Sequence, residues 1–280
     1  MAPARLSATW LLACALLLGG RAAPAQQLSA IRDSVVSPNT HPTTEEPPRS
    51  RKTRRRSYDG CDDDSFFAEL GLFALATPYL LPYYMFDEPC CDRFESYSQQ
   101  ETDHGFKETD WFCRSTEGVS SARGLVEYGT DFSDIDSVGA KLQVDLPVAR
   151  MTLDASAVEY SERMVGGGSD SLTLGDANLV FRFAQNSYTV WRSGLGVNWM
   201  ADARDDVGFN FTYGFDYLPS KPYVVSAEID WGRLGETHLF RGRTTVGVQW
   251  RDFEAYTGYE YLDIESVELS TMLFGVRGWW

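Results

Sequence analysis

The stretch Met272-Leu273-Phe274-Gly275-Val276-Arg277-Gly278-Trp279-Trp280 closes the sequence and decides the fold. Side chains of a β-strand point alternately to its two faces, with a period of two residues. Phe274, Val276 and Trp280 therefore share one face, while Gly275 lies on the other with the arginine of this stretch. The pattern predicts a strand with one apolar and one polar face that ends on an aromatic residue.

The same alternation runs through the chain from Val119 onward. Between positions 209 and 217, for example, every second residue is aromatic and the residues between them are polar or glycine. We count about ten such segments. They lie near 123–129, 138–146, 151–157, 178–183, 191–199, 209–217, 223–231, 240–250, 253–261 and 267–280.

Two further patterns favour a membrane barrel over a soluble β-domain. Aromatic residues stand near the ends of the apolar faces, where a transmembrane barrel has its interfacial girdles. They are Trp199, Tyr217, Tyr223, Trp231, Trp250 and Phe253. Glycines recur on the polar faces. There they would have no purpose against water, whereas in a crowded lumen they make room for larger neighbours.

These features resemble the bacterial outer-membrane β-barrels. The closing strand of such barrels carries a glycine, then aromatic or apolar residues at alternating positions, and an aromatic carboxyl-terminal residue. Leu273, Gly275 and Trp280 stand at the corresponding offsets, and Gly278 departs from the pattern. The resemblance covers residues 119–280 and is to the architecture class, not to one family.

The resemblance implies an all-β fold: an up-and-down antiparallel transmembrane barrel of about ten strands, with eight also possible. It also implies that the protein lies in the bacterial outer membrane in contact with its lipid, with the N-terminal region in the periplasm. The barrel-assembly machinery is the implied partner of the C-terminal strand.

The polar faces carry charges of both signs that would point into the lumen. They are Lys141, Asp145, Asp154, Arg182, Arg192, Asp216, Glu228, Asp230, Arg241, Arg243, Glu254, Glu260 and Arg277. An unpaired charge removed from water is costly, so we expect opposite signs to form a network. Because about ten strands enclose a bore that side chains nearly fill, we predict a gated or closed lumen.

The first part of the chain divides into three segments. Residues 1–25 have a basic start, an apolar run and small residues at the end, which is typical of a signal peptide. Residues 26–57 are rich in Ser, Thr, Pro and charge, and predict a disordered linker. Its basic run, Arg51–Arg56, is either simply solvated or attracts anionic envelope polymers. Residues 58–115 form a cysteine-bounded periplasmic or plug region before the barrel at 116–280.

Cysteine usage suits an exported protein. Of the five cysteines, one lies in the predicted signal peptide; Cys61, Cys90, Cys91 and Cys113 remain, and an even number favours disulfides. The neighbouring Cys90 and Cys91 are expected to pair with Cys61 and Cys113, in an order that the spacing does not determine. These cysteines with His104 match no common metal site, so no metal is expected.

Composition and motifs restrict the function. A net charge of −15 argues against nucleic-acid binding, which needs a basic surface. The sequence has no zinc-protease motif, phosphate loop, dinucleotide fingerprint or serine nucleophile elbow, so we expect neither an enzyme nor a cofactor. We predict a non-enzymatic envelope structural or surface-interaction protein. The alternatives are a narrow porin-like channel for small solutes or ions, gated by residues 58–115, and a soluble β-barrel binding protein.

Overall fold

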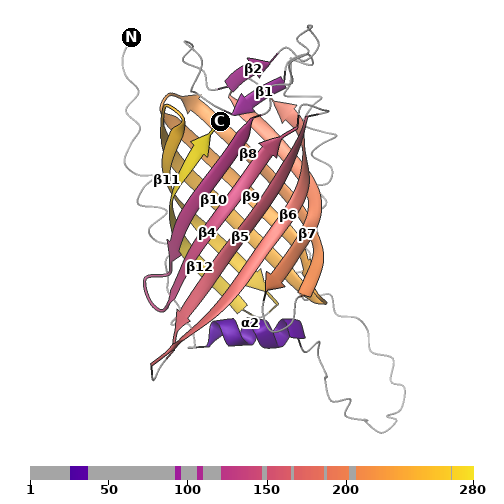
Figure 1. Ribbon diagram of the computed structural model, residues 1–280, viewed down its shortest axis with the longest axis vertical. Helices are drawn as coiled ribbons and strands as arrows, with labels where there is room; N and C mark the ends of the chain where they lie inside the picture. Colours follow the sequence, from indigo (N-terminus) through magenta and orange to yellow (C-terminus); the bar gives the residue numbers. More distant parts are fainter. Residues whose placement is uncertain are drawn as a thin grey trace, which may run out of the picture.

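Ten antiparallel strands close into a barrel in chain order in the computed structural model (Figure 1). The structure describes residues 26–36, 92–95, 106–109, 121–146, 150–164, 167–185, 188–201, 206–265 and 267–280. The barrel strands are β3 (Ala122–Thr130), β4 (Ile135–Asp145), β5 (Met151–Arg163), β6 (Ser169–Gln185), β7 (Thr189–Ala201), β8 (Asp206–Ser220), β9 (Tyr223–Leu234), β10 (Thr237–Trp250), β11 (Phe253–Ile264) and β12 (Val267–Trp279). The predicted architecture class and strand number are confirmed.

The two ends of the barrel differ in what they carry. β12 pairs with β3 to complete the ring, and beside this seam Ala122 and Trp280 exchange two backbone hydrogen bonds of 3.0 and 2.8 Å. We call this the terminal end. The connections from β3 to β4, β5 to β6, β7 to β8, β9 to β10 and β11 to β12 all lie at the opposite end, which we call the loop end.

The outer wall of the barrel is apolar. Large side chains on alternate residues are exposed along it, including Val126, Val138, Leu142, Leu153, Leu179, Leu195, Val246 and Val276. Of the predicted interfacial aromatics, Tyr217, Tyr223, Trp250 and Phe253 are exposed at the terminal end, while Trp199 and Trp231 are half-buried toward the loop end. An apolar band between aromatic rims is the surface expected of a barrel in lipid.

The packing of Trp280 explains why Gly278 departs from the usual pattern of a closing strand. Leu273 faces inward and is buried, whereas Trp280 is 69% exposed. A Cβ atom added to Gly278 would lie 2.9 Å from the Trp280 ring, and one added to Gly124 would lie 3.1 Å from it. Gly124 and Gly278 are partners across the seam. The ring therefore packs over the closing strand pair, in space that only glycine leaves free.

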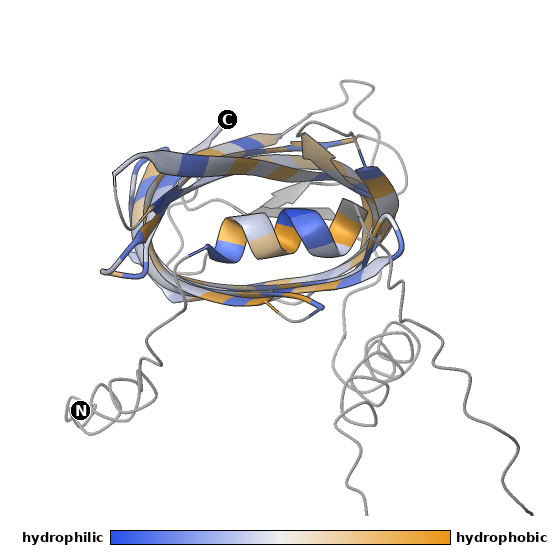
Figure 2. Cartoon of the chain, turned by 90° about the horizontal axis from the view of Figure 1, so that it is seen from below, coloured by the Kyte–Doolittle hydropathy of each residue, from blue (hydrophilic) through white to orange (hydrophobic). Residues whose placement is uncertain are grey.

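Helix α2 (Gln27–Val36) lies across the loop end of the barrel (Figure 2). The prediction of a disordered linker over residues 26–57 is therefore wrong for this part. Leu28, Ile31 and Val35 recur at helical spacing and form one apolar face, which the barrel covers. The composition of residues 26–57 as a whole is polar, so this short apolar period is not apparent from it. The described part of the chain contains no helix that is long and apolar enough to cross a membrane.

Strands β1 (Asp92–Glu95) and β2 (Phe106–Thr109) form a separate two-stranded antiparallel sheet. It lies near the terminal end, remote from α2 (Figure 1). The four cysteines, residues 1–25 and the run Arg51–Arg56 fall outside the described residues. The disulfides, the signal peptide and the basic run therefore stay predictions.

The packing of Trp280 over the seam predicts an effect on barrel closure. Trp280→Ala should reduce, severalfold, the fraction of chain that runs as a compact form on an unheated gel and shifts on boiling. Trp250→Ala is the matched control, because Trp250 is 72% exposed at the same end but lies away from the seam. Equal losses in the two variants would show that the ring matters only as an interfacial aromatic.

Candidate functional site

The middle of the lumen is crossed by ion pairs between opposite walls. Lys141 on β4 places its Nζ atom 2.6 Å from Glu228 Oε1 on β9 and 3.0 Å from Asp154 Oδ2 on β5. In the ring of ten strands, β4 and β9 face each other. The lysine side chain is only 7% exposed. This group therefore bridges two strands on opposite sides of the ring.

A second set of contacts crosses the lumen next to the first. Arg241 on β10 binds Asp230 Oδ2 on β9 at 2.8 Å and Asp176 Oδ2 on β6 at 2.5 Å. The Tyr160 hydroxyl on β5 donates to Glu260 on β11 at 2.8 Å. Opposite charges lie together in a space removed from bulk water, as the cost of isolated charges requires.

Further pairs continue the network toward the terminal end. Arg277 lies 3.0 Å from Glu254, Arg182 lies 3.2 Å from Asp145, and Arg192 pairs with Asp216. Arg243 pairs with Glu127, which also accepts a hydrogen bond of 2.8 Å from the Tyr256 hydroxyl. Small hollows lie beside these pairs, including two that are both lined by Arg123, Gln143 and Arg192.

The structure places every residue predicted for the lumen on the inner wall. Most of them pair within the predicted set, whereas Arg243 and Glu260 meet residues that the sequence analysis omitted. The omitted members are Arg123, Glu127, Tyr160, Asp176 and Tyr256. Tyr160 and Asp176 lie just beyond the predicted segments, on the faces of Asp154 and Arg182, so extending the alternation would have found them. The other three lie inside predicted segments, on the inward face that the alternation defines.

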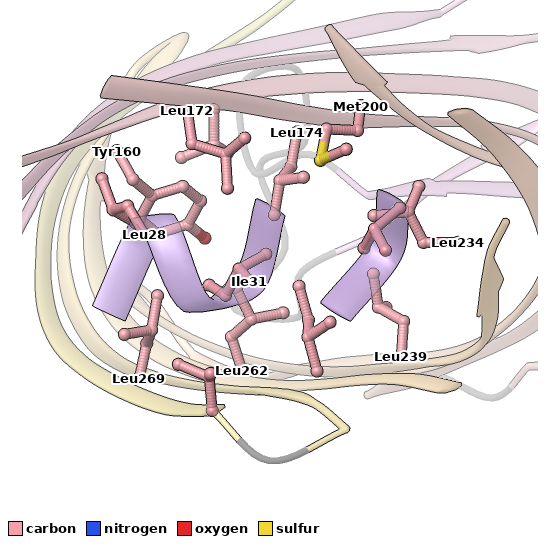
Figure 3. Packing of buried hydrophobic residues seen from close by; sticks show 14 of the residues in the cluster. Leu28, Ile31, Tyr160, Leu172, Leu174, Met200, Leu234, Leu239, Leu262 and Leu269 are labelled. Carbon is pink, nitrogen blue, oxygen red and sulfur yellow. The ribbon is translucent and has the colours of Figure 1, made fainter. Parts of the chain in front are cut away.

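The inner wall changes from charged to apolar at the loop end. Leu28 and Ile31 of α2 are fully buried there, and the side chains around them come from strands on all sides (Figure 3). The barrel residues of this cluster include Tyr160, Leu172, Leu174, Met200, Leu234, Leu239, Leu262, Ile264 and Leu269. The helix therefore supplies the apolar surface that these inward residues need.

Polar contacts hold α2 at three points. The carboxylate of Glu162 accepts hydrogen bonds from the backbone nitrogens at the start of the helix. Arg32 donates to both carboxylate oxygens of Asp170, at 3.1 Å each. At the far end, the Thr237 hydroxyl donates to the Ser34 carbonyl at 3.1 Å. A carboxylate at a helix N-terminus also has favourable electrostatics, because the helix dipole is positive there.

Side chains therefore occupy the lumen at two levels. Charged side chains join opposite walls in the middle, and α2 covers the loop end. Within the ranges that the structure describes, no group of three or more His, Cys, Asp and Glu side chains is arranged to hold a metal ion. What this arrangement can do chemically is hold opposite charges together across the lumen.

Comparisons with known proteins give structural matches only. No family model and no curated protein matches the chain. The outer membrane protein Ail of Yersinia pestis, in a phospholipid bilayer nanodisc, is 11% identical, with 58% of this chain and 100% of that chain covered and a TM-score of 0.33.

Two further solved structures match. The β domain of the Bordetella autotransporter BrkA is 12% identical, with 57% and 98% covered and a TM-score of 0.33. The KdgM porin is 13% identical, with 57% and 98% covered and a TM-score of 0.28. All three are bacterial proteins whose strands form barrels, as the strands of this chain do.

The buried ion pairs predict a large effect of removing a single partner. Lys141→Met leaves Glu228 and Asp154 without their common cation and should lower the free energy of unfolding by about 3–5 kcal/mol. Arg163→Met is the matched control, because its pair with Asp136 is at the surface, with the arginine side chain 67% exposed. That change should cost less than about 1 kcal/mol.

Urea unfolding in lipid vesicles, followed by tryptophan fluorescence, measures both variants. The double variant Lys141→Met/Glu228→Gln should regain part of the lost free energy of unfolding, because it removes one of the two carboxylates that Lys141→Met leaves without a cation. Similar losses of unfolding free energy in Lys141→Met and Arg163→Met would mean that water screens the charges of the lumen as strongly as it screens charges at the surface.

Proposed function

We propose that this protein is a closed outer-membrane β-barrel that serves the bacterial envelope as a non-enzymatic structural element and anchor. The apolar outer wall between aromatic rims supports a position in lipid, where a β-sheet satisfies every backbone hydrogen bond only if it is closed. The terminal end would face the periplasm, where the assembly machinery would meet the C-terminal strand.

The observation that carries the proposal is the filled lumen. A channel needs a continuous polar path, and here Lys141 with Glu228 and Asp154 occupies the middle while α2 covers one mouth. Pairs that bridge opposite walls also tie the barrel together, which suits a protein whose task is mechanical. A filled lumen therefore favours an anchor over a porin-like channel.

The short connections at the loop end support the same proposal. Only residues 235–236 separate β9 from β10, and only 265–266 separate β11 from β12. The barrel itself therefore presents little surface beyond the membrane. In this proposal it anchors the segment between α2 and β3, whose run Arg51–Arg56 would attract anionic envelope polymers.

The helix that covers one mouth is α2, residues 27–36. The gate that the channel alternative assigns to residues 58–115 is a separate feature, and conductance distinguishes the two functions.

We predict that the purified full-length protein gives no stable conductance in planar lipid bilayers, and that deleting residues 58–115 leaves it closed. Removing residues 27–36 together with Lys141→Ala, Asp154→Ala and Glu228→Ala should open a conducting path, because both obstructions are then reduced. A steady conductance of the intact protein, or one gained on deleting 58–115 alone, would establish the channel function instead.

A further inference from the structure

Glu162 is a buried carboxylate that takes no part in the lumen ion pairs. It lies on β5 at the loop end and is 2% exposed. Its oxygens accept hydrogen bonds from the backbone nitrogens of Gln26, Gln27 and Leu28 at 2.7, 2.9 and 3.0 Å. Glu228 and Glu254 face cations, whereas in the described part of the chain no lysine or arginine forms an ion pair with Glu162.

A buried carboxylate is costly unless strong donors or a cation meet it. The nitrogen of Gln26 is the nearest of the three donors, at 2.7 Å from Glu162 Oε1. As a peptide N–H this nitrogen carries no charge. As the first nitrogen of a chain it is an ammonium, which gives a charge-assisted hydrogen bond of about twice the strength.

The backbone of Gln26 suits a first residue. Its φ angle is +98°, in a region that L-residues other than glycine rarely adopt. The φ restriction arises from the carbonyl group of the preceding residue, so it disappears when Gln26 has no predecessor. Gln26 is also the first residue after the signal peptide that the sequence predicts over residues 1–25.

We propose that Glu162 is the binding site for the N-terminal ammonium of the processed chain. Signal-peptide cleavage would create the ligand: water adds across the Ala25–Gln26 peptide bond, Ala25 leaves with the new carboxylate, and Gln26 keeps the new ammonium. The ammonium pairs with Glu162, and this ion pair latches α2 across the loop end of the lumen.

The other contacts of α2 with the barrel hold the Gln26 nitrogen beside Glu162. Leu28, Ile31 and Val35 are buried in the apolar layer, and Arg32 binds Asp170 on the neighbouring strand β6. The helix is thus held along its length with its first turn directed at the carboxylate. The inference goes beyond the proposed anchor function, because the latch would form whether or not the barrel conducts.

The first test uses the full chain, expressed with its signal peptide and purified from the outer membrane. Mass spectrometry should find Gln26 as the first residue, with its amine neither cyclised nor blocked. In the folded protein an amine-reactive ester should label this amine slower than in the denatured protein by about tenfold or more, the ratio that ~1.4 kcal/mol of latch stability gives.

Three variants separate the ion pair from general docking of the helix. Glu162→Gln keeps the shape of the side chain but removes its charge, and should raise the labelling rate to near that of the denatured protein. One alanine inserted between Ala25 and Gln26 moves the amine by about 3.8 Å and should do the same with Glu162 intact. Asp136→Asn is the control: it removes a partly exposed ion pair, with Arg163, that does not involve α2, and it should change the rate far less.

Boiling-dependent gel mobility identifies the folded fraction of each variant, and the insertion variant decides the matter if Glu162→Gln does not fold. A mature chain that begins elsewhere, or one with a cyclised Gln26, overturns the proposal. So does an amine that labels equally fast in the folded wild type and in the insertion variant.

Discussion

Closure of the sheet at β12 and β3 is the constraint on which the rest of the structure depends. Once the ring is closed, every second residue of each strand points into a lumen of limited width. Charges placed there lose bulk water and must find partners on the facing wall. Lys141 with Glu228 and Arg241 with Asp176 meet this requirement across the barrel. The same closure leaves the opposite faces to form a continuous apolar exterior.

The lumen is not uniform, and its apolar layer accounts for α2. Inward residues such as Leu172, Met200 and Leu262 would line an apolar mouth if nothing covered them. Three apolar side chains of α2 cover them, but fixing a ten-residue helix is costly in conformational entropy. The polar contacts of the helix with Glu162 and Asp170 therefore matter for its position as much as the apolar packing does.

Period-two alternation was sufficient to predict the barrel, its strand number and the inward charges. It could not predict which charges pair, because partners such as Lys141 and Glu228 are far apart in sequence and meet only through the closed ring. Helix α2 was missed for a different reason. Its apolar period is short and lies in a polar segment. The apolar surface that stabilises it belongs to strands β4 to β7 and β9 to β12.

The docking surface of α2 also couples the helix to the closure of the barrel. Glu162 and Asp170 lie on β5 and β6, whereas Thr237 and Leu269 belong to β10 and β12, on the other side of the seam. An open sheet would hold these two groups apart, so the complete surface exists only in the closed ring. A segment that binds the closed form and not the open one stabilises the closed form by its binding free energy. The helix at the start of the described chain therefore supports the strand pair formed at its end.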